Sequence, residues 1–191
     1  MFTECKPGSF IYTLDDALSA AECTAMISQF EASGDQQVAG RIGQQAHAEQ
    51  SIKRSTDLRI SGRPDWARHD AALRNSLGKA LGLLSGLHPF FKVNRMHDIG
   101  YNLQRTHPGG YYHWHLDSGP GDFAMRQLVA IWYLNDAPRQ GGETQFYFQE
   151  VSITPREGML VLFPPFWTHL HRGAEVIDGV KYIATTWVCV D

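Results

Sequence analysis

The carboxyl-terminal half of this 191-residue chain is a series of short β-rich segments, and this pattern constrains the fold most strongly. Gly, Pro, Asn and Asp separate the segments, as expected where strands are joined by turns. Many short strands with such turns predict a β-barrel or sandwich rather than a parallel sheet. The six segments are residues 100–106, 111–116, 128–134, 144–148, 159–163 and 182–190.

Two helices are expected before these strands. Residues 14–33 carry apolar side chains near helical spacing, with Ser19 among the candidate N-caps and Gly34 as a stop. A second helix is expected from Pro64 to about Gly86. Residues 38–55 between them are polar, so that a mobile surface loop and a lid over a site both remain open. We expect one domain, with a helical support and lid region at 1–89 and a barrel core at 90–191.

Charge and cysteine content exclude several classes of function. The 17 Lys and Arg residues nearly balance 20 Asp and Glu residues, so we expect no nucleic-acid partner and no membrane partner. No apolar run approaches the roughly 18 residues that a membrane span needs. The three cysteines, Cys5, Cys23 and Cys189, are scattered, which favours a reducing compartment and predicts a cytoplasmic location.

Nine histidines stand out in this composition, and four of them form two pairs at two-residue spacing. In a strand, both members of the pair His113/His115 or His169/His171 point to the same side. Asp117 extends the first pair on that side. Two histidines and one carboxylate can form a facial triad with open positions, which is typical of non-haem Fe(II). A chance His-x-Asp packed among aromatic residues is the alternative for the first pair alone.

Lys181 lies among apolar neighbours in a segment that has the character of a strand. Alternation places Lys181, Ile183, Thr185 and Trp187 on one face. If that face points inward, the ammonium needs an anion, because desolvating an unpaired charge costs several kcal/mol. A carboxylate ligand would satisfy it, together with a hydroxyl such as that of Thr185 or Tyr133. A solvated, outward-facing lysine is the alternative.

Three blocks of residues occur in chain order with regular spacing. They are Gly109, Tyr112, His115 and Asp117; then Arg126, Tyr133-Leu134-Asn135 and Gly141-Gly142-Glu143-Thr144-Gln145-Phe146; then Pro155, Gly158, His171, Lys181 and Trp187. Together they resemble the catalytic barrel of Fe(II)- and 2-oxoglutarate-dependent dioxygenases, in the prolyl 4-hydroxylase-like family. The resemblance covers roughly the last ninety residues. It implies an α+β, mainly β fold, a double-stranded β-helix (jelly-roll) barrel with amino-terminal supporting helices, forming a single dioxygenase domain.

The resemblance also implies roles for individual residues. His115, Asp117 and His171 would bind the metal, so His113 and His169 become neighbours of the site. Lys181 would bind the distal carboxylate of 2-oxoglutarate, with Tyr133 and Thr185 in the same pocket. The cofactors implied are Fe(II), 2-oxoglutarate as co-substrate and O2, with ascorbate as a further candidate.

Other positions are less constrained by the resemblance. Arg126 and Trp187 are candidates for the substrate side, and no catalytic residue is expected beyond the metal centre. The family has Tyr three residues before the Gly, whereas this chain has Thr106 beside Arg105. Contacts at that end of the pocket are therefore left open.

The function implied is hydroxylation of a C–H bond with release of succinate and CO2. A prolyl residue in a peptide or protein is the first expected substrate, and a free amino acid or another small metabolite is the alternative. A non-catalytic metal-binding barrel is a third hypothesis. A cupin site is disfavoured because Gly119, Pro120 and Gly121 occupy the positions where its Glu would fall. The oligomeric state is not predicted.

Overall fold

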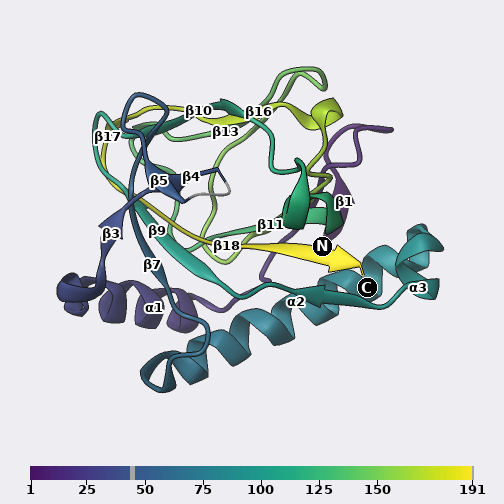
Figure 1. Cartoon of the computed structure of the whole chain (residues 1–191), viewed down its shortest axis with the longest axis horizontal. Coiled ribbons are helices and arrows are strands. Elements are labelled where there is room, and N and C mark those ends of the chain that lie inside the picture. Colours follow the sequence, from purple (N-terminus) through teal and green to yellow (C-terminus); the bar gives the residue numbers. More distant parts are fainter. Residues whose placement is uncertain (44–45, 191) are drawn as a thin grey trace.

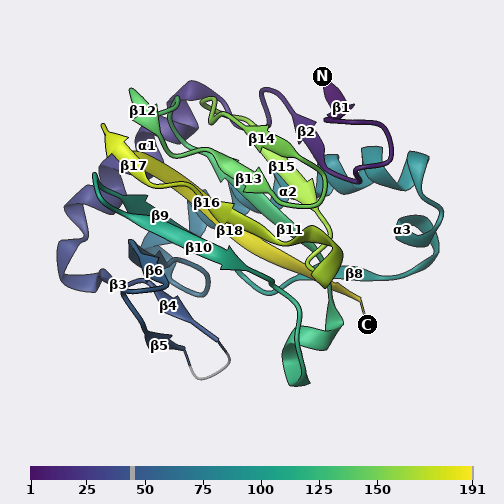
Figure 2. The ribbon, with the colours of Figure 1, turned by 90° about the horizontal axis from the view of Figure 1, so that it is seen from above.

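The computed structural model of this protein describes residues 1–43 and 46–190, and its centre is a pair of antiparallel sheets that face one another. The helices cover the outer face of the larger sheet, so that three layers follow one another (Figure 1). Seen from above, β10 and β16 of the smaller sheet lie across β18 of the larger one (Figure 2). This arrangement confirms the predicted mainly β, double-stranded β-helix fold.

The larger sheet has β18 near its middle, paired antiparallel with β11 on one side and with β9 on the other. This pairing places the carboxyl-terminal strand between the strands that the sequence predicts at 100–106 and 128–134. In spatial order the strands are β1 (Phe2–Glu4), β2 (Tyr12–Leu14), β15 (Leu160–Phe163), β11 (Arg126–Tyr133), β18 (Lys181–Val190), β9 (Asn102–Thr106), β7 (Thr56–Arg59) and β3 (Val38–Ala39), and β8 (Met96–Asp98) also pairs with β18.

The smaller sheet brings two distant parts of the chain together. Its strands are, in order, β14 (Val151–Ile153), β13 (Thr144–Phe146), β16 (His171–Gly173), β10 (Tyr111–His115) and β6 (Lys53–Arg54). His115 and His171 are direct partners in the register of β10 and β16, and the register shifts between Tyr112 and His115. Two further pairs complete the described strands, namely β12 (Gln140–Gly141) with β17 (Val176–Asp178), and β4 (Arg41–Ile42) with β5 (His47–Ala48).

The two long helices begin and end near the predicted residues. A capping box starts the first one, because the Glu22 amide donates to Ser19 Oγ and the Ser19 amide donates to a Glu22 carboxylate oxygen. The second follows a short 3-10 turn that opens with Pro64. The helical segments are α1 (Ala20–Ala32), α2 (Ala67–Leu87) and α3 (Phe90–Val93), with 3-10 turns at Gly34–Gln36, Pro64–Trp66, Gly121–Met125 and Trp167–His169.

Two hydrophobic cores surround the larger sheet. The first lies between this sheet and the helices, and it includes Trp132, whose indole nitrogen donates to Ser76 on α2. The second fills one end of the space between the two sheets with side chains such as Tyr133, Phe146 and Phe163. Each buried large side chain stabilises the fold by about 1.5–3 kcal/mol. Four side chains of this core or packed against it also line a cavity: Val129, Ile131, Ile183 and Trp187.

The amino-terminal region is more than the helical support that the sequence predicts. Strands β1, β2, β3 and β7 extend the larger sheet and β6 extends the smaller one. Most of these strands are two or three residues long, too short for an alternation of apolar and polar residues to reveal them. The segment 38–55 contains β3, β4, β5 and β6, and its residues 44–45 lie outside the described part. None of the described helices is long and apolar enough to cross a membrane.

Candidate active site

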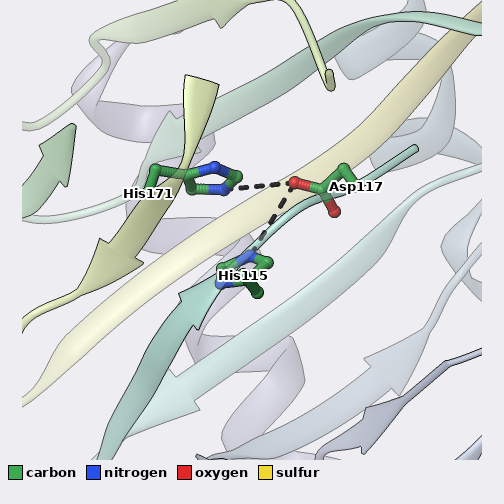
Figure 3. A group of neighbouring side chains, drawn as sticks. All are labelled: His115, Asp117 and His171. Atoms are coloured by element: carbon green, nitrogen blue, oxygen red, sulfur yellow. Dashed lines mark ion pairs between the residues drawn. The ribbon is translucent and has the colours of Figure 1, made fainter. Parts of the chain in front are cut away.

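Three side chains converge between the two sheets at the end of β10 and the start of β16 (Figure 3). Asp117 Oδ2 lies 3.1 Å from Nε2 of His171 and 3.7 Å from Nε2 of His115. Ligand atoms about 2.1 Å from one metal ion, at right angles, would lie about 3 Å apart. The side chains His115, Asp117 and His171 thus fit one metal ion as a facial triad. They are the predicted ligand set, and the structure brings all three together.

Backbone carbonyls orient both histidine rings. Nδ1 of His115 donates to the carbonyl of His113 at 2.7 Å, and Nδ1 of His171 donates to the carbonyl of His169 at 2.9 Å. Each bond directs Nε2 toward Asp117, on the side of the ring where a metal would bind. The two extra histidines therefore contribute to the site through their backbone. Their side chains are absent from the described wall of the cavity: His113 is exposed, and His169 is buried against Ser9.

Asp117 is held by groups from three segments. Its Oδ1 accepts a 2.9 Å hydrogen bond from the indole nitrogen of Trp187, which leaves Oδ2 facing the histidines. Its backbone carbonyl accepts a 2.7 Å bond from Arg126 Nη1, and its amide donates to the carbonyl of Pro165. The carboxylate therefore has a defined orientation without help from a metal.

Electrostatics hold His115 and Asp117 in the protonation states that a metal requires. Burial, and to a lesser degree the neighbouring His171, lower the pKa of His115 to about 3, so its ring is neutral at neutral pH. Burial alone would raise the pKa of Asp117, but the hydrogen bond from His171 and the nearby histidines outweigh it and hold that pKa below its usual range. Two imidazole nitrogens and one carboxylate oxygen, with further positions open, are the donor set that suits non-haem Fe(II).

A cavity of about 880 Å³ opens beside the triad. The face of β18 that alternation predicts does point into it, because Lys181, Ile183, Thr185 and Trp187 all line its wall. Alternate side chains of the neighbouring strands also line the cavity, including Val129 and Ile131 from β11 and Asn102, Gln104 and Thr106 from β9.

Lys181 is a buried cation in this wall. Its side chain is 6% exposed, and Nζ donates a 2.6 Å hydrogen bond to the carbonyl of Gly142. Burial lowers its pKa to about 8, which the charge of Glu143 only partly opposes. No described carboxylate forms an ion pair with this ammonium. An anion in the cavity would therefore complete its environment.

Tyr133 lies behind Thr144 rather than in the pocket wall where the sequence analysis expects it. It is fully buried, and its hydroxyl donates a 2.6 Å bond to Thr144 Oγ1. Thr144 is part of the cavity wall, whereas Tyr133 is absent from the described wall. The Lys181 ammonium lies 5.3 Å from the centre of the Tyr133 ring. Thr144 belongs to the Gly-Gly-Glu-Thr block, and that block was the available signal for it.

Arg126 and Trp187, the candidates for the substrate side, both line the cavity and stack on one another. The guanidinium lies 3.7 Å from the centre of the Phe123 ring and 4.0 Å from that of Trp187. At the other end, Thr106 lines the cavity, while Arg105 faces away and pairs with Glu31 on α1 at 2.7 Å.

Sequence reasoning missed a polar group in the part of the cavity wall formed by β6 and β7. Lys53 of β6 and Asp57 of β7 form a buried 2.7 Å ion pair, to which Ser55 and Asn102 add hydrogen bonds. The Lys53 ammonium lies 5.3 Å from the ring of Tyr112, and that ring stacks on His115 at 3.5 Å. The i, i+4 spacing of Lys53 and Asp57 was the only signal, and in a polar segment it is typical of a solvated surface.

Comparison with known proteins agrees with this site. Residues 101–189 match the family model of the 2OG-Fe(II) oxygenase superfamily, and a comparison with curated proteins finds no match. The viral collagen prolyl hydroxylase of Paramecium Bursaria Chlorella virus-1, solved with 2OG, has a TM-score of 0.72 at 21% identity over 97% of this chain and 98% of its own.

Two further solved structures are similar. A prolyl hydroxylase from Trichoplax adhaerens, in complex with a peptide fragment of hypoxia inducible factor, has a TM-score of 0.78 at 17% identity over 96% of this chain and 84% of its own. A Pseudomonas putida prolyl-4-hydroxylase has a TM-score of 0.70 at 17% identity over 96% and 94%. At these identities the likeness establishes the fold.

Proposed function

We propose that this chain, a 2-oxoglutarate-dependent dioxygenase of the 2OG-Fe(II) oxygenase superfamily, hydroxylates a C–H bond of a prolyl residue in a peptide or protein. The products would be the hydroxylated residue, succinate and CO2. The observation that carries the proposal is the triad His115, Asp117 and His171, oriented beside a cavity with a buried lysine in its wall.

The metal ligands in this proposal are the three residues of the triad. Bound Fe(II), with 2-oxoglutarate and O2, supplies the oxidising chemistry that breaks an unactivated C–H bond. The protein contributes orientation, because the carbonyls of His113 and His169 hold the rings and Trp187 holds Asp117. It also contributes a defined protonation state, since His115 stays neutral at neutral pH.

Lys181 is the proposed anchor for the distal carboxylate of 2-oxoglutarate. A dicarboxylate is a suitable partner because the ammonium is 6% exposed and has no described carboxylate paired with it. Thr144, which accepts from Tyr133, and Thr185 line the same cavity and offer hydroxyl groups to that carboxylate. Tyr133 would then support the anchor through Thr144 and through its ring beside the ammonium.

One observation favours a prolyl residue over other substrates. The three similar solved structures reported above are prolyl hydroxylases, one of them bound to a peptide. The cavity of about 880 Å³ is far larger than one 2-oxoglutarate molecule needs and falls within the size range of substrate pockets. Apolar and aromatic side chains, such as Val129 and Trp187, line it beside the triad.

The test is a turnover assay with Fe(II), 2-oxoglutarate and O2, using proline-containing peptides and free amino acids in parallel. We expect a peptide to gain one oxygen atom per succinate released. His171→Ala and Asp117→Ala should abolish both products. His113→Ala should not, because His113 is the exposed partner of His115 in the first histidine pair. If no peptide stimulates succinate release but a free amino acid does, the alternative substrate class is correct. Unchanged turnover in the triad variants would exclude the proposed metal centre.

A further inference from the structure

Arg126 is a buried cation that the proposed chemistry leaves without a counter-ion. Its side chain is 6% exposed and stacks between Phe123 and Trp187 in the cavity wall. One nitrogen donates to the backbone carbonyl of Asp117, and Nε is buried without a hydrogen-bond partner. A guanidinium presents five donors, so most of its capacity is unused among the described residues.

The other charges of the loaded site balance one another. The two charges of a ferrous ion and the one of Lys181 offset Asp117 and the dianion of 2-oxoglutarate. Lys53 and Asp57 neutralise each other at 2.7 Å. The positive charge of Arg126 is therefore left without a counter-ion, and burying an unpaired charge in the cavity wall is energetically unfavourable.

The mouth of the cavity adds positive charge and no described carboxylate to offset it. Arg41 and Arg59 line the cavity and are exposed, and Arg59 donates to the carbonyl of Ile99 rather than to an acid. Asp57 and Asp117 are the acidic residues of the described wall, and both are already engaged. The field in the substrate half of the cavity is therefore positive.

We infer that the substrate carries a carboxylate close to the hydroxylated carbon, and that Arg126 binds it. The guanidinium is suited to this role, because its planar fork can donate two parallel hydrogen bonds to a carboxylate while its faces stay stacked on aromatic rings. The bond to the Asp117 carbonyl, 2.7 Å long, keeps the guanidinium beside the metal ligands. This inference rests on the proposed function for the identity of the reacting carbon.

Two sources of carboxylate have the same chemistry: an acidic side chain next to the prolyl residue, or the terminal carboxylate of a prolyl residue or free amino acid. Three matched pairs separate them. A peptide with Glu beside the proline is compared with its Gln counterpart, a carboxyl-terminal prolyl peptide with its carboxamide, and free proline with prolinamide. The acid of at least one pair should have a kcat/KM about tenfold to a hundredfold above its amide, as charge-assisted hydrogen bonds allow.

Arg126→Gln should bring that ratio close to one, while Arg126→Lys should retain part of it. Arg172→Gln is the matched control, because Arg172 is a similarly stacked arginine, on Trp114, that is absent from the described cavity wall. Should Arg126→Gln fail to fold, the wild-type acid-to-amide ratios remain decisive. Ratios within about twofold for all three pairs, or a full preference in Arg126→Gln, would overturn the inference.

The same pairs separate this inference from the proposed function. Calorimetric binding to protein loaded with Mn(II) and 2-oxoglutarate reports on the anion subsite without turnover. Hydroxylation of neutral prolyl peptides with no preference for acids would leave the proposed function intact and refute the inference. Preferential binding of acids, with no prolyl substrate hydroxylated, would support the inference and refute the proposed function.

Discussion

The hydrogen bond between Trp187 and Asp117 offers a direct test of how the metal centre is oriented. Trp187→Phe removes the indole N–H that donates to Oδ1 at 2.9 Å, and it keeps an aromatic ring against Arg126. A hydrogen bond to a charged group contributes about 1.5–3 kcal/mol. Loss of an outer partner of a metal ligand weakens metal binding about tenfold to a hundredfold. We expect a loss near the lower end, because the carbonyl and amide of Asp117 stay bonded.

The assay is calorimetric titration of the metal-free protein with Mn(II), which occupies the same kind of site without turnover. Trp167→Phe is the matched control, since this side chain is 72% exposed. Thermal unfolding without metal, measured on both variants, separates a loss of orientation from a loss of fold. Mn(II) affinity within about twofold of wild type in Trp187→Phe would refute the proposed orienting role.

Three further predictions concern the cavity and its supports. Because the pKa of Lys181 is lowered to about 8, its charge is present below pH 8 and lost above it. In a calorimetric series, the dissociation constant of 2-oxoglutarate should therefore be flat below pH 8 and rise about tenfold per pH unit above it. Lys181→Met should weaken binding and remove this pH dependence. A flat profile in the wild type would contradict the anchoring role. Asp57→Ala should lower the free energy of unfolding by about 3 kcal/mol in urea denaturation, because it leaves the 5%-exposed Lys53 ammonium unpaired; a loss below about 1 kcal/mol would show that water reaches this pair. Gly158→Ala should lower the free energy of unfolding by about 1–3 kcal/mol, because Gly158 has φ +76° and an added Cβ would lie 2.3 Å from the carbonyl oxygen of Leu18. Gly82→Ala on α2 is the control: its Cβ would meet nothing within 4 Å, so it should be stabilising. Equal effects of the two substitutions would contradict the strain argument.

The metal triad could be predicted from the sequence because its members follow local rules. His115 and Asp117 are two residues apart, although β10 ends at His115. The second histidine pair offers a partner, and the family resemblance selects His115 and His171 from the two pairs. What periodicity could not supply is the register of β10 against β16, which puts His115 opposite His171. Alternation predicted the inward face of β18 equally well, because that strand is ten residues long.

The rest of the site depends on contacts between distant segments. Lys53 and Asp57 lie on strands of two and four residues, where no periodic pattern distinguishes a buried pair from a solvated one. The bond from Trp187 to Asp117 joins residues 70 positions apart. Tyr133 has the same alternation as the lining residues Val129 and Ile131, but it is fully buried and donates to Thr144, which lines the cavity in its place.

The most direct measurement of the central claim follows 2-oxoglutarate turnover and substrate mass in one reaction, with wild type and Asp117→Ala side by side. We predict that the wild type adds one oxygen atom to a prolyl peptide for each succinate released, and that Asp117→Ala forms neither product. Succinate release that persists in Asp117→Ala, or a wild type that binds Fe(II) and 2-oxoglutarate but oxidises no substrate of any class, would contradict the claim.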